Sequence, residues 1–343
     1  MSVRSSPRRR RNLAVVALLG VVLGAGGYLA YQVLSAPSPG AAPGWALLAE
    51  MPNPRGETAA AVIGSRLYVL GGLAGVAAQA STDVSVYDVT TNEWSTGPAL
   101  PESRHHAAAT ADDVAVYITG GASSVVDWTP TDTMWVLRAG ADTWQAVAPM
   151  PDARLGHRMV VLAGILYVVG GIGDRASGVA PGTTLAYDPA ADAWSERAPL
   201  ALNRDHLAVV VVEGRIWALG GRAGGGNHAL VDIYDPTADA WQGGPSLPEP
   251  VSGAAEGAVG GQILLSGGED PGAGVIVDRH WLLDTRAGEA AAWVELPGPP
   301  LTVHGAPGVI VGDRFVIPGG SSRPGGQSST AWTGATQVLV DRP

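Results

Sequence analysis

The chain has 343 residues, of which 46% are apolar and 15% charged, with a formal net charge of −10 and no cysteine. The lack of cysteine excludes disulfides, thiolate metal sites and a cysteine nucleophile. Beyond the first eleven residues, 16 arginines stand against 31 acidic residues. That surface would repel a nucleic acid, so we predict no nucleic-acid partner.

The N-terminus has the features of a membrane anchor. Residues 1–11 carry five arginines, and the segment 13–34 is uncharged over 22 residues. About 20 apolar residues cross a bilayer, and flanking arginines stay in the cytoplasm. We expect a basic cytoplasmic tail at 1–11, a transmembrane signal-anchor helix at 12–34 and a single-pass protein whose body lies outside the cytosol. The alternative is export after signal cleavage near Ala36. Residues 35–44 contain three prolines and predict an extended linker.

The body from residue 45 onward repeats one unit about every 50 residues. A short β-branched or aromatic segment, such as LYVLGG, ends each time in a glycine pair, which predicts a buried strand and a tight backbone turn. The pairs recur at intervals of 49, 50, 50, 47 and 52 residues. They are Gly71 and Gly72, Gly120 and Gly121, Gly170 and Gly171, Gly220 and Gly221, Gly267 and Gly268, and Gly319 and Gly320.

A tryptophan also recurs with the repeat. In three repeats a Tyr-Asp pair ends a strand, the aspartate favours a turn, and the tryptophan opens the next strand and packs between sheets. The last repeat stops before its tryptophan, whereas Trp45 precedes the first repeat. We expect the strand from Trp45 to complete the last sheet and close a ring. The tryptophans are Trp45, Trp94, Trp144, Trp194, Trp241 and Trp293.

These glycine pairs, Tyr-Asp turns and tryptophans resemble the Kelch-repeat β-propeller family, in particular its bacterial, membrane-anchored or exported members. The resemblance implies four strands per blade. We therefore expect an all-β, six-bladed propeller at residues 45–343, closed by its N-terminal strand. The galactose-oxidase-like members need copper and a cysteine cross-linked to tyrosine, so the lack of cysteine excludes that enzyme type. No cofactor is expected.

Four arginines share one spacing, 16 residues before a glycine pair: Arg55, Arg104, Arg154 and Arg204. The Kelch resemblance places them near one mouth of the central channel, where we predict that they bind an anionic group together with His106 and His157. The alternative is that they bond to carbonyls of neighbouring blades. His105 and His106 should point to opposite sides of a strand, and no His-x-x-x-His or His-x-His pair occurs, so no metal site is predicted.

The loops after the glycine pairs carry the variation, and binding usually resides on such loops. Trp128 and Trp332 are candidates to contact a sugar ring or a peptide side chain, or else are packed loop anchors. We expect a membrane-tethered, extracytoplasmic module that binds a protein or glycan. The alternative is an enzyme resembling sialic-acid mutarotases, acting on an acidic sugar at the channel mouth. There Glu57 or His206 would move the anomeric proton.

Overall fold

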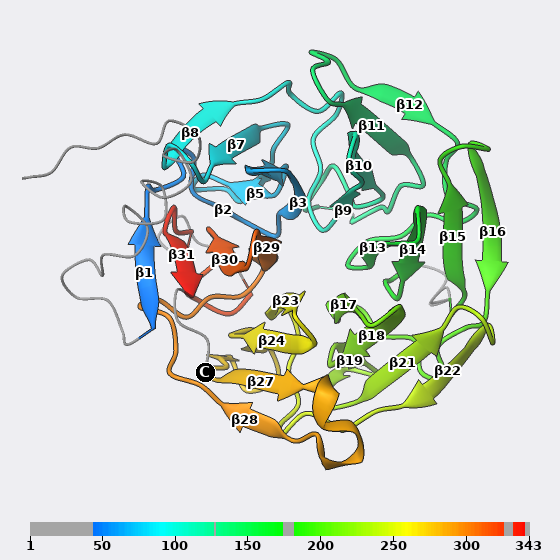
Figure 1. Ribbon diagram of the computed structural model, residues 1–343. Helices are drawn as coiled ribbons and strands as arrows, with labels where there is room; N and C mark the ends of the chain where they lie inside the picture. The colour runs from blue at the N-terminus through cyan, green and yellow to red at the C-terminus, as the bar shows by residue number, and fades with distance from the viewer. Residues whose placement is uncertain (1–43, 127, 174–181, 326–331, 340–343) are drawn as a thin grey trace, which may run out of the picture.

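The computed structural model describes residues 44–126, 128–173, 182–325 and 332–339. In these residues, six four-stranded antiparallel sheets stand around a central axis like the blades of a propeller (Figure 1). The predicted tail, the anchor and residues 35–43 of the linker lie outside the described residues. Among the described residues, no helix is both long enough and apolar enough to cross a membrane.

Each blade has an inner strand beside the axis and an outer strand at the rim. From inside to outside, the strands are β3 (Ala59–Ile63), β4 (Arg66–Leu70), β7 (Val84–Asp88) and β8 (Glu93–Thr96) in the first blade; β9 (Ala108–Ala111), β10 (Ala115–Thr119), β11 (Met134–Arg138) and β12 (Gln145–Val147) in the second; β13 (Arg158–Leu162), β14 (Ile165–Val169), β15 (Thr184–Asp188) and β16 (Ala193–Arg197) in the third; β17 (Ala208–Val212), β18 (Arg215–Leu219), β21 (Val231–Asp235) and β22 (Ala240–Gly243) in the fourth; β23 (Ala255–Val259), β24 (Gln262–Ser266), β27 (His280–Asp284) and β28 (Trp293–Glu295) in the fifth; and β29 (Val309–Val311), β30 (Arg314–Pro318), β31 (Thr336–Leu339) and β1 (Trp45–Leu48) in the sixth.

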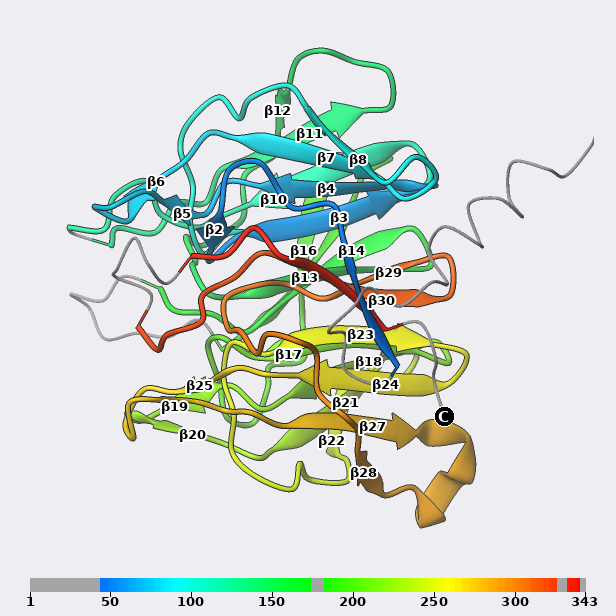
Figure 2. The same cartoon turned by 90° about the vertical axis from the view of Figure 1, so that its left-hand side faces the viewer.

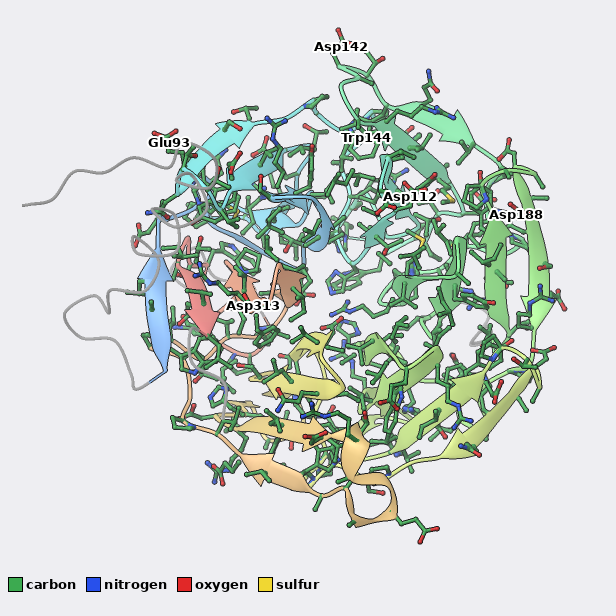
Figure 3. The ribbon with its side chains drawn as sticks, viewed as in Figure 1. Glu93, Asp112, Asp142, Trp144, Asp188 and Asp313 are labelled. Atoms are coloured by element: carbon green, nitrogen blue, oxygen red, sulfur yellow. The ribbon has the colours of Figure 1, made fainter. Side chains whose placement is uncertain are left out.

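The hydrophobic cores lie between neighbouring blades. The inner strand β3 reads AAAVI, and such small side chains let the inner strands converge on the axis. One buried cluster joins Leu70 and Val84 of the first blade to Val116 and Ile118 of the second. Figure 3 shows side chains filling the spaces between sheets, while the labelled acids Glu93 and Asp142 lie at the outer rim.

The paired glycines sit where one blade meets the next. Gly71 has φ 58° and Gly72 has φ 96°, a backbone conformation that favours glycine. A Cβ on Gly71 would lie 2.4 Å from the Arg104 carbonyl oxygen, and the Gly72 amide donates to that oxygen at 2.7 Å. The same bond recurs at every junction, with carbonyl acceptors from Arg154, Arg204, Val251, Val303 and Arg55. The glycine pairs are therefore backbone devices that join the blades.

The N-terminal strand closes the ring as predicted. β1 pairs antiparallel with β31, with Trp45 opposite Leu339. Trp45 is buried, and its indole Nε1 donates to the Pro297 carbonyl of the preceding blade at 2.9 Å. The equivalent indoles make the same bond to a preceding-blade carbonyl, from Trp94 to Ala49, Trp144 to Pro98, Trp194 to Ala148, Trp241 to Ala198 and Trp293 to Pro245.

Short strands project from one face of the propeller, which we call the loop face (Figure 2). They are β2 (Arg55–Gly56), β5 (Leu73–Ala74), β6 (Gln79–Ala80), β19 (Arg222–Ala223), β20 (Gly226–Asn227), β25 (Glu269–Asp270) and β26 (Val275–Ile276). The 3-10 helix η1 (Thr285–Ala290) lies between β27 and β28 and accounts for the longer spacing before Trp293.

Candidate functional site

The loop face contains a cavity of about 320 Å³ over the central axis. Its walls come from the first, second, fourth, fifth and sixth blades, and the residues are Glu57, Leu73, Ala77, Ala78, His106, Val125, Trp128, His206, Arg222, Glu269, Pro271, His304 and Gly325. Figure 3 shows side-chain nitrogens gathered close to the axis. A polar cavity walled by several blades is the strongest candidate for a functional site.

A closed backbone ring surrounds the axis at this mouth of the channel. It uses one position per blade, two residues after the carbonyl that accepts from the glycine pair. The amide of each position donates to the carbonyl of the preceding one at 2.8–3.1 Å, and Thr58 closes the ring onto Gly305 at 3.4 Å. All positions have φ between 51° and 66°. They are Glu57, His106, Gly156, His206, Gly253 and Gly305.

Three of these ring positions carry side chains although the backbone favours glycine: Glu57, His106 and His206. Such a conformation costs a non-glycine residue roughly 1–3 kcal/mol and persists mostly where function requires the side chain. A Cβ on Gly305 would lie 2.5 Å from Glu57 Oε1, so glycine there leaves room for the carboxylate. The positive φ also breaks the strand alternation. The prediction that His105 and His106 point apart is therefore wrong, since their Nδ1 atoms lie 2.6 Å apart.

Glu57 lies at the centre of a cluster of polar side chains. Its Oε2 is 3.2 Å from His106 Nε2, and its Oε1 is 3.4 Å from His304 Nδ1. Ligand atoms of Glu57, His106 and His206 lie within 4.8 Å of one another. The two residues named from sequence as candidates for proton transfer, Glu57 and His206, are thus brought together.

The surroundings separate the protonation states of this cluster. Burial raises the pKa of Glu57, but His106, His304, His206 and Arg222 outweigh burial and hold that pKa at about 2. Burial lowers the pKa of His106 well below its usual range, although Glu57 opposes the shift. At neutral pH Glu57 is therefore ionised and His106 neutral, and Arg222 supplies a permanent positive charge beside the carboxylate.

A second layer of charged groups holds the cluster. Arg222 Nε donates to Asp205 Oδ1 at 2.8 Å, and its NH1 donates to Glu269 Oε1 at 3.3 Å. Asp205 Oδ1 also lies 2.5 Å from His206 Nδ1. The Gly325 amide donates to Glu269 Oε2 at 2.9 Å. Arg222 and Glu269 lie on the loops after the glycine pairs, and neither was singled out from the sequence.

Trp128 forms an aromatic wall of the cavity. Its ring lies 4.8 Å from the His106 ring and 5.0 Å from the His105 ring, centroid to centroid. The side chain is partly exposed, so one part of the indole is available to a ligand. Trp332 differs, because it is buried against Leu73 and Ala78 and its Nε1 donates to a loop carbonyl. Its contacts are those of a packed loop anchor.

The four predicted arginines lie in the walls between strands and do not line the cavity. Arg55 Nε donates to the Gly71 carbonyl at 2.8 Å, and Arg204 Nε does the same to Gly220 at 2.6 Å. Arg154 bonds to the Gly170 carbonyl at 3.2 Å. Arg104 pairs with Glu102 at 2.8 Å. All four are at most 2% exposed, and their contacts favour the structural alternative over contact with a ligand.

His157 is also remote from the cavity. It is fully buried, and a Cβ on Gly120 would lie 2.5 Å from its ring. Burial, with Arg154 and Arg158, lowers its pKa to about 3. Its ring fills the junction between the second and third blades, as Leu207 does beneath Gly170 at the next junction.

Comparisons with known proteins agree with this architecture. The family model described as KLHDC2/KLHL20/DRC7 Kelch-repeats domain matches residues 45–201, and the Kelch motif model matches residues 203–248. The chain belongs to the Kelch-repeat family. As a Kelch protein it is 33% identical to human Kelch-like protein 34 over 178 residues, which are 49% of this chain and 26% of that protein.

Other relatives share the same repeats. Beta-scruin of Limulus polyphemus is 36% identical over 125 residues, covering 35% of this chain and 13% of that protein. Kelch-like protein terF of Aspergillus terreus is 31% identical over 188 residues, covering 50% of this chain and 39% of that protein. The matched part is thus less than half the length of each of these relatives.

A solved structure shares the fold of this Kelch propeller. The structure titled "Structure of YjhT" superposes with a TM-score of 0.70 at 17% identity, covering 84% of this chain and 95% of that chain. The likeness extends over nearly the whole of that chain and supports the propeller architecture alone.

Proposed function

We propose that this Kelch propeller is tethered to a membrane, lies outside the cytosol and binds a glycan through its loop-face cavity. The observation that carries the proposal is the partly exposed Trp128 ring beside the buried polar groups of Glu57 and His106. The apolar face of a sugar packs on an indole, and its hydroxyls bond to fixed polar groups. Ligand cavities measure about 300–1,000 Å³, so about 320 Å³ suits one terminal sugar unit.

The charge of the cavity favours a neutral ligand. Glu57 and Glu269 line it together with Arg222, and that arginine already pairs with Glu269 and Asp205. An anionic group would meet the uncompensated Glu57 carboxylate. The sequence-based expectation of an anionic ligand rested on the four arginines that the structure buries, so we propose a neutral sugar instead.

The tether rests on the sequence of the first 34 residues. Five arginines precede the uncharged segment 13–34, and this order holds the N-terminus in the cytoplasm. Protease added outside intact cells should remove the propeller and leave a small membrane fragment. Recovery of a soluble protein beginning near Ala36 would contradict the tether and support export with cleavage.

A glycan array probed with the full chain in detergent tests the binding proposal. We expect a hit carrying a neutral terminal sugar, and Trp128→Ala should weaken that binding at least tenfold. Val126→Ala is the matched control, because Val126 is 91% exposed on the same loop and does not line the cavity. Full affinity in Trp128→Ala would refute this site. A folded protein that binds no glycan but a protein partner would assign the loop face to protein recognition.

A mutarotase-like activity is a second candidate. The observation in its favour is the ionised Glu57 carboxylate 3.2 Å from a neutral histidine, His106, because anomer exchange needs an acid and a base on one sugar. Exchange between the anomers of an acidic sugar, followed by NMR, should then be accelerated by the wild-type chain and lost in Glu57→Gln. No acceleration by the wild-type chain would exclude this activity for the sugar tested.

A further inference from the structure

The ring nitrogens of His106 are assigned by a short relay. The Ser124 carbonyl can only accept, and it lies 3.1 Å from His105 Nε2, so that nitrogen carries the proton and His105 Nδ1 accepts. His106 Nδ1 lies 2.6 Å from His105 Nδ1 and must donate to it. The lone pair of a neutral His106 is therefore on Nε2, which faces the Glu57 carboxylate at 3.2 Å.

His304 presents the same arrangement from the sixth blade. Its Nε2 lies 2.8 Å from the Arg323 carbonyl and donates to it, which leaves the lone pair of the neutral ring on Nδ1. This atom is buried and makes no hydrogen bond within the part of the chain that the structure describes. It faces Glu57 Oε1 at 3.4 Å and Glu269 Oε2 at 3.6 Å.

His206 completes the set. Its Nδ1 donates to Asp205 Oδ1 at 2.5 Å, so its lone pair is on Nε2. An Arg222 guanidinium nitrogen is 2.9 Å from both ring nitrogens of His206. Equal distances place that nitrogen over the ring face rather than in line with either lone pair. The Nε2 lone pair of His206 is therefore left for another partner.

Lone pairs and carboxylate oxygens that face one another repel unless a positive centre lies between them. One proton can satisfy one such pair, whereas a divalent cation satisfies all of them at once. We propose that Glu57, His106, His206 and His304 bind a divalent first-row transition-metal ion on the axis of the propeller, beneath the cavity.

The distances fit such a site after small side-chain rotations. Adjacent ligand atoms around an ion with bonds of about 2.1 Å lie about 3.0 Å apart in octahedral and about 3.4 Å apart in tetrahedral geometry. Glu57 is 3.2 Å from His106 and 3.4 Å from His304. The ligand atoms of Glu57, His106 and His206 lie within 4.8 Å of one another, so His206 closes inward by about an ångström or more.

The outer contacts of the three histidines are those of metal ligands. A ligating histidine characteristically donates its other ring N–H to a carboxylate or a carbonyl, which fixes the ring and its tautomer. His206 donates to Asp205, His304 to the Arg323 carbonyl, and His106 to His105. All four proposed ligands are held before any ion arrives.

Charge and donor type define the ion. Imidazole with one carboxylate and no thiolate suits zinc, iron, manganese, cobalt, nickel or copper as divalent ions. Arg222 adds a positive charge beside the site, which Asp205 at 2.8 Å and Glu269 at 3.3 Å offset. The Glu57 carboxylate is then left to balance the ion.

Metal content and metal titration of the full chain test the inference without any sugar. The protein is purified in detergent without a metal-affinity resin, its metals are measured by mass spectrometry, and the chelator-treated protein is titrated with Zn²⁺ and with Co²⁺, whose visible absorption reports bound ligands. We expect about one ion per chain. His106→Asn and His206→Asn should each weaken binding at least tenfold, and asparagine tolerates the positive φ at both positions.

Two further variants make the result specific. Asp205→Asn keeps the ligands but changes the group that orients His206, and outer partners of this kind change metal affinity about 10–100-fold. His228→Asn removes a loop-face histidine outside the cluster, which bonds to the Ala223 carbonyl, and it should bind metal like the wild type. Far less than one ion per chain after titration of folded protein, or unchanged affinity in His106→Asn and His206→Asn, would overturn the site. Glycan binding plays no part in either outcome.

Discussion

Replacing Arg55 by valine tests whether the repeated arginine holds the blades together. The Arg55 side chain is fully buried and donates to the Gly71 carbonyl at 2.8 Å and to Ser85 Oγ at 3.1 Å. Valine is the residue that the fifth repeat carries at this place, as Val251, where the backbone bond to the glycine pair is retained. Arg55→Val therefore removes the side-chain contacts and keeps the junction between blades.

The expected loss follows from the acceptors left behind. Each buried polar group that loses its partner costs about 1–3 kcal/mol, so the two acceptors together predict a loss of about 2–5 kcal/mol. A folded body of about 300 residues has an unfolding entropy near 0.6 kcal/mol per kelvin, so Tm should fall by about 3–8 °C. Differential scanning calorimetry of the full chain measures this shift.

Arg66→Val is the matched control in the same blade. The Arg66 side chain is 63% exposed and approaches Asp88 only at 3.9 Å, and an exposed pair of this kind contributes about 0–1 kcal/mol. Its Tm should change by less than about 2 °C. If Arg55→Val melts like the wild type but loses binding to the glycan found on the array, the arginine contacts the ligand and the structural reasoning is refuted.

The remaining predictions concern ring closure and acid stability. Trp45→Ala removes a large buried ring from the closing strand, which costs about 3–5 kcal/mol, and an unchanged melting temperature would contradict closure through β1. Because the His157 pKa falls to about 3 in the folded state, the unfolded chain binds a proton that the folded chain does not between about pH 6.5 and 3. Stability should fall as pH falls through this window, by at most about 1.4 kcal/mol per pH unit from this group. His157→Leu, chosen because Leu207 fills the next junction, should flatten that slope in urea unfolding at pH 7, 5.5 and 4.5, and an identical slope would contradict the burial argument.

The fold was predictable because its signals are local and recur. Each glycine pair meets the next repeat through its own backbone, so the φ values of Gly71 and Gly72 and the approach of the Arg104 carbonyl are written into one short segment. The unpaired Trp45 at the front likewise pointed to the closing strand, because its indole bond repeats that of the other tryptophans.

The site was only partly predictable because its residues come from separate blades. Searching for histidines close in sequence could not reveal His106 and His206, which lie a hundred residues apart. One signal was available: Glu57, His106 and His206 each lie two residues after the repeated arginine. Arg222 and Glu269 lie on loops with no such register, and only the ring geometry shows that they meet.

The central claim is that the loop-face cavity over the axis is the binding site, and a substitution that fills it tests the claim most directly. Ala77 is exposed and lines the cavity, whereas its neighbour Val76 is 81% exposed and does not. Ala77→Trp should block the cavity without touching Glu57 or the histidines. The affinity of the full chain for its array-identified glycan should fall at least tenfold in Ala77→Trp and stay unchanged in Val76→Trp, with both variants melting like the wild type. Unchanged affinity in Ala77→Trp would place the ligand elsewhere and contradict the account.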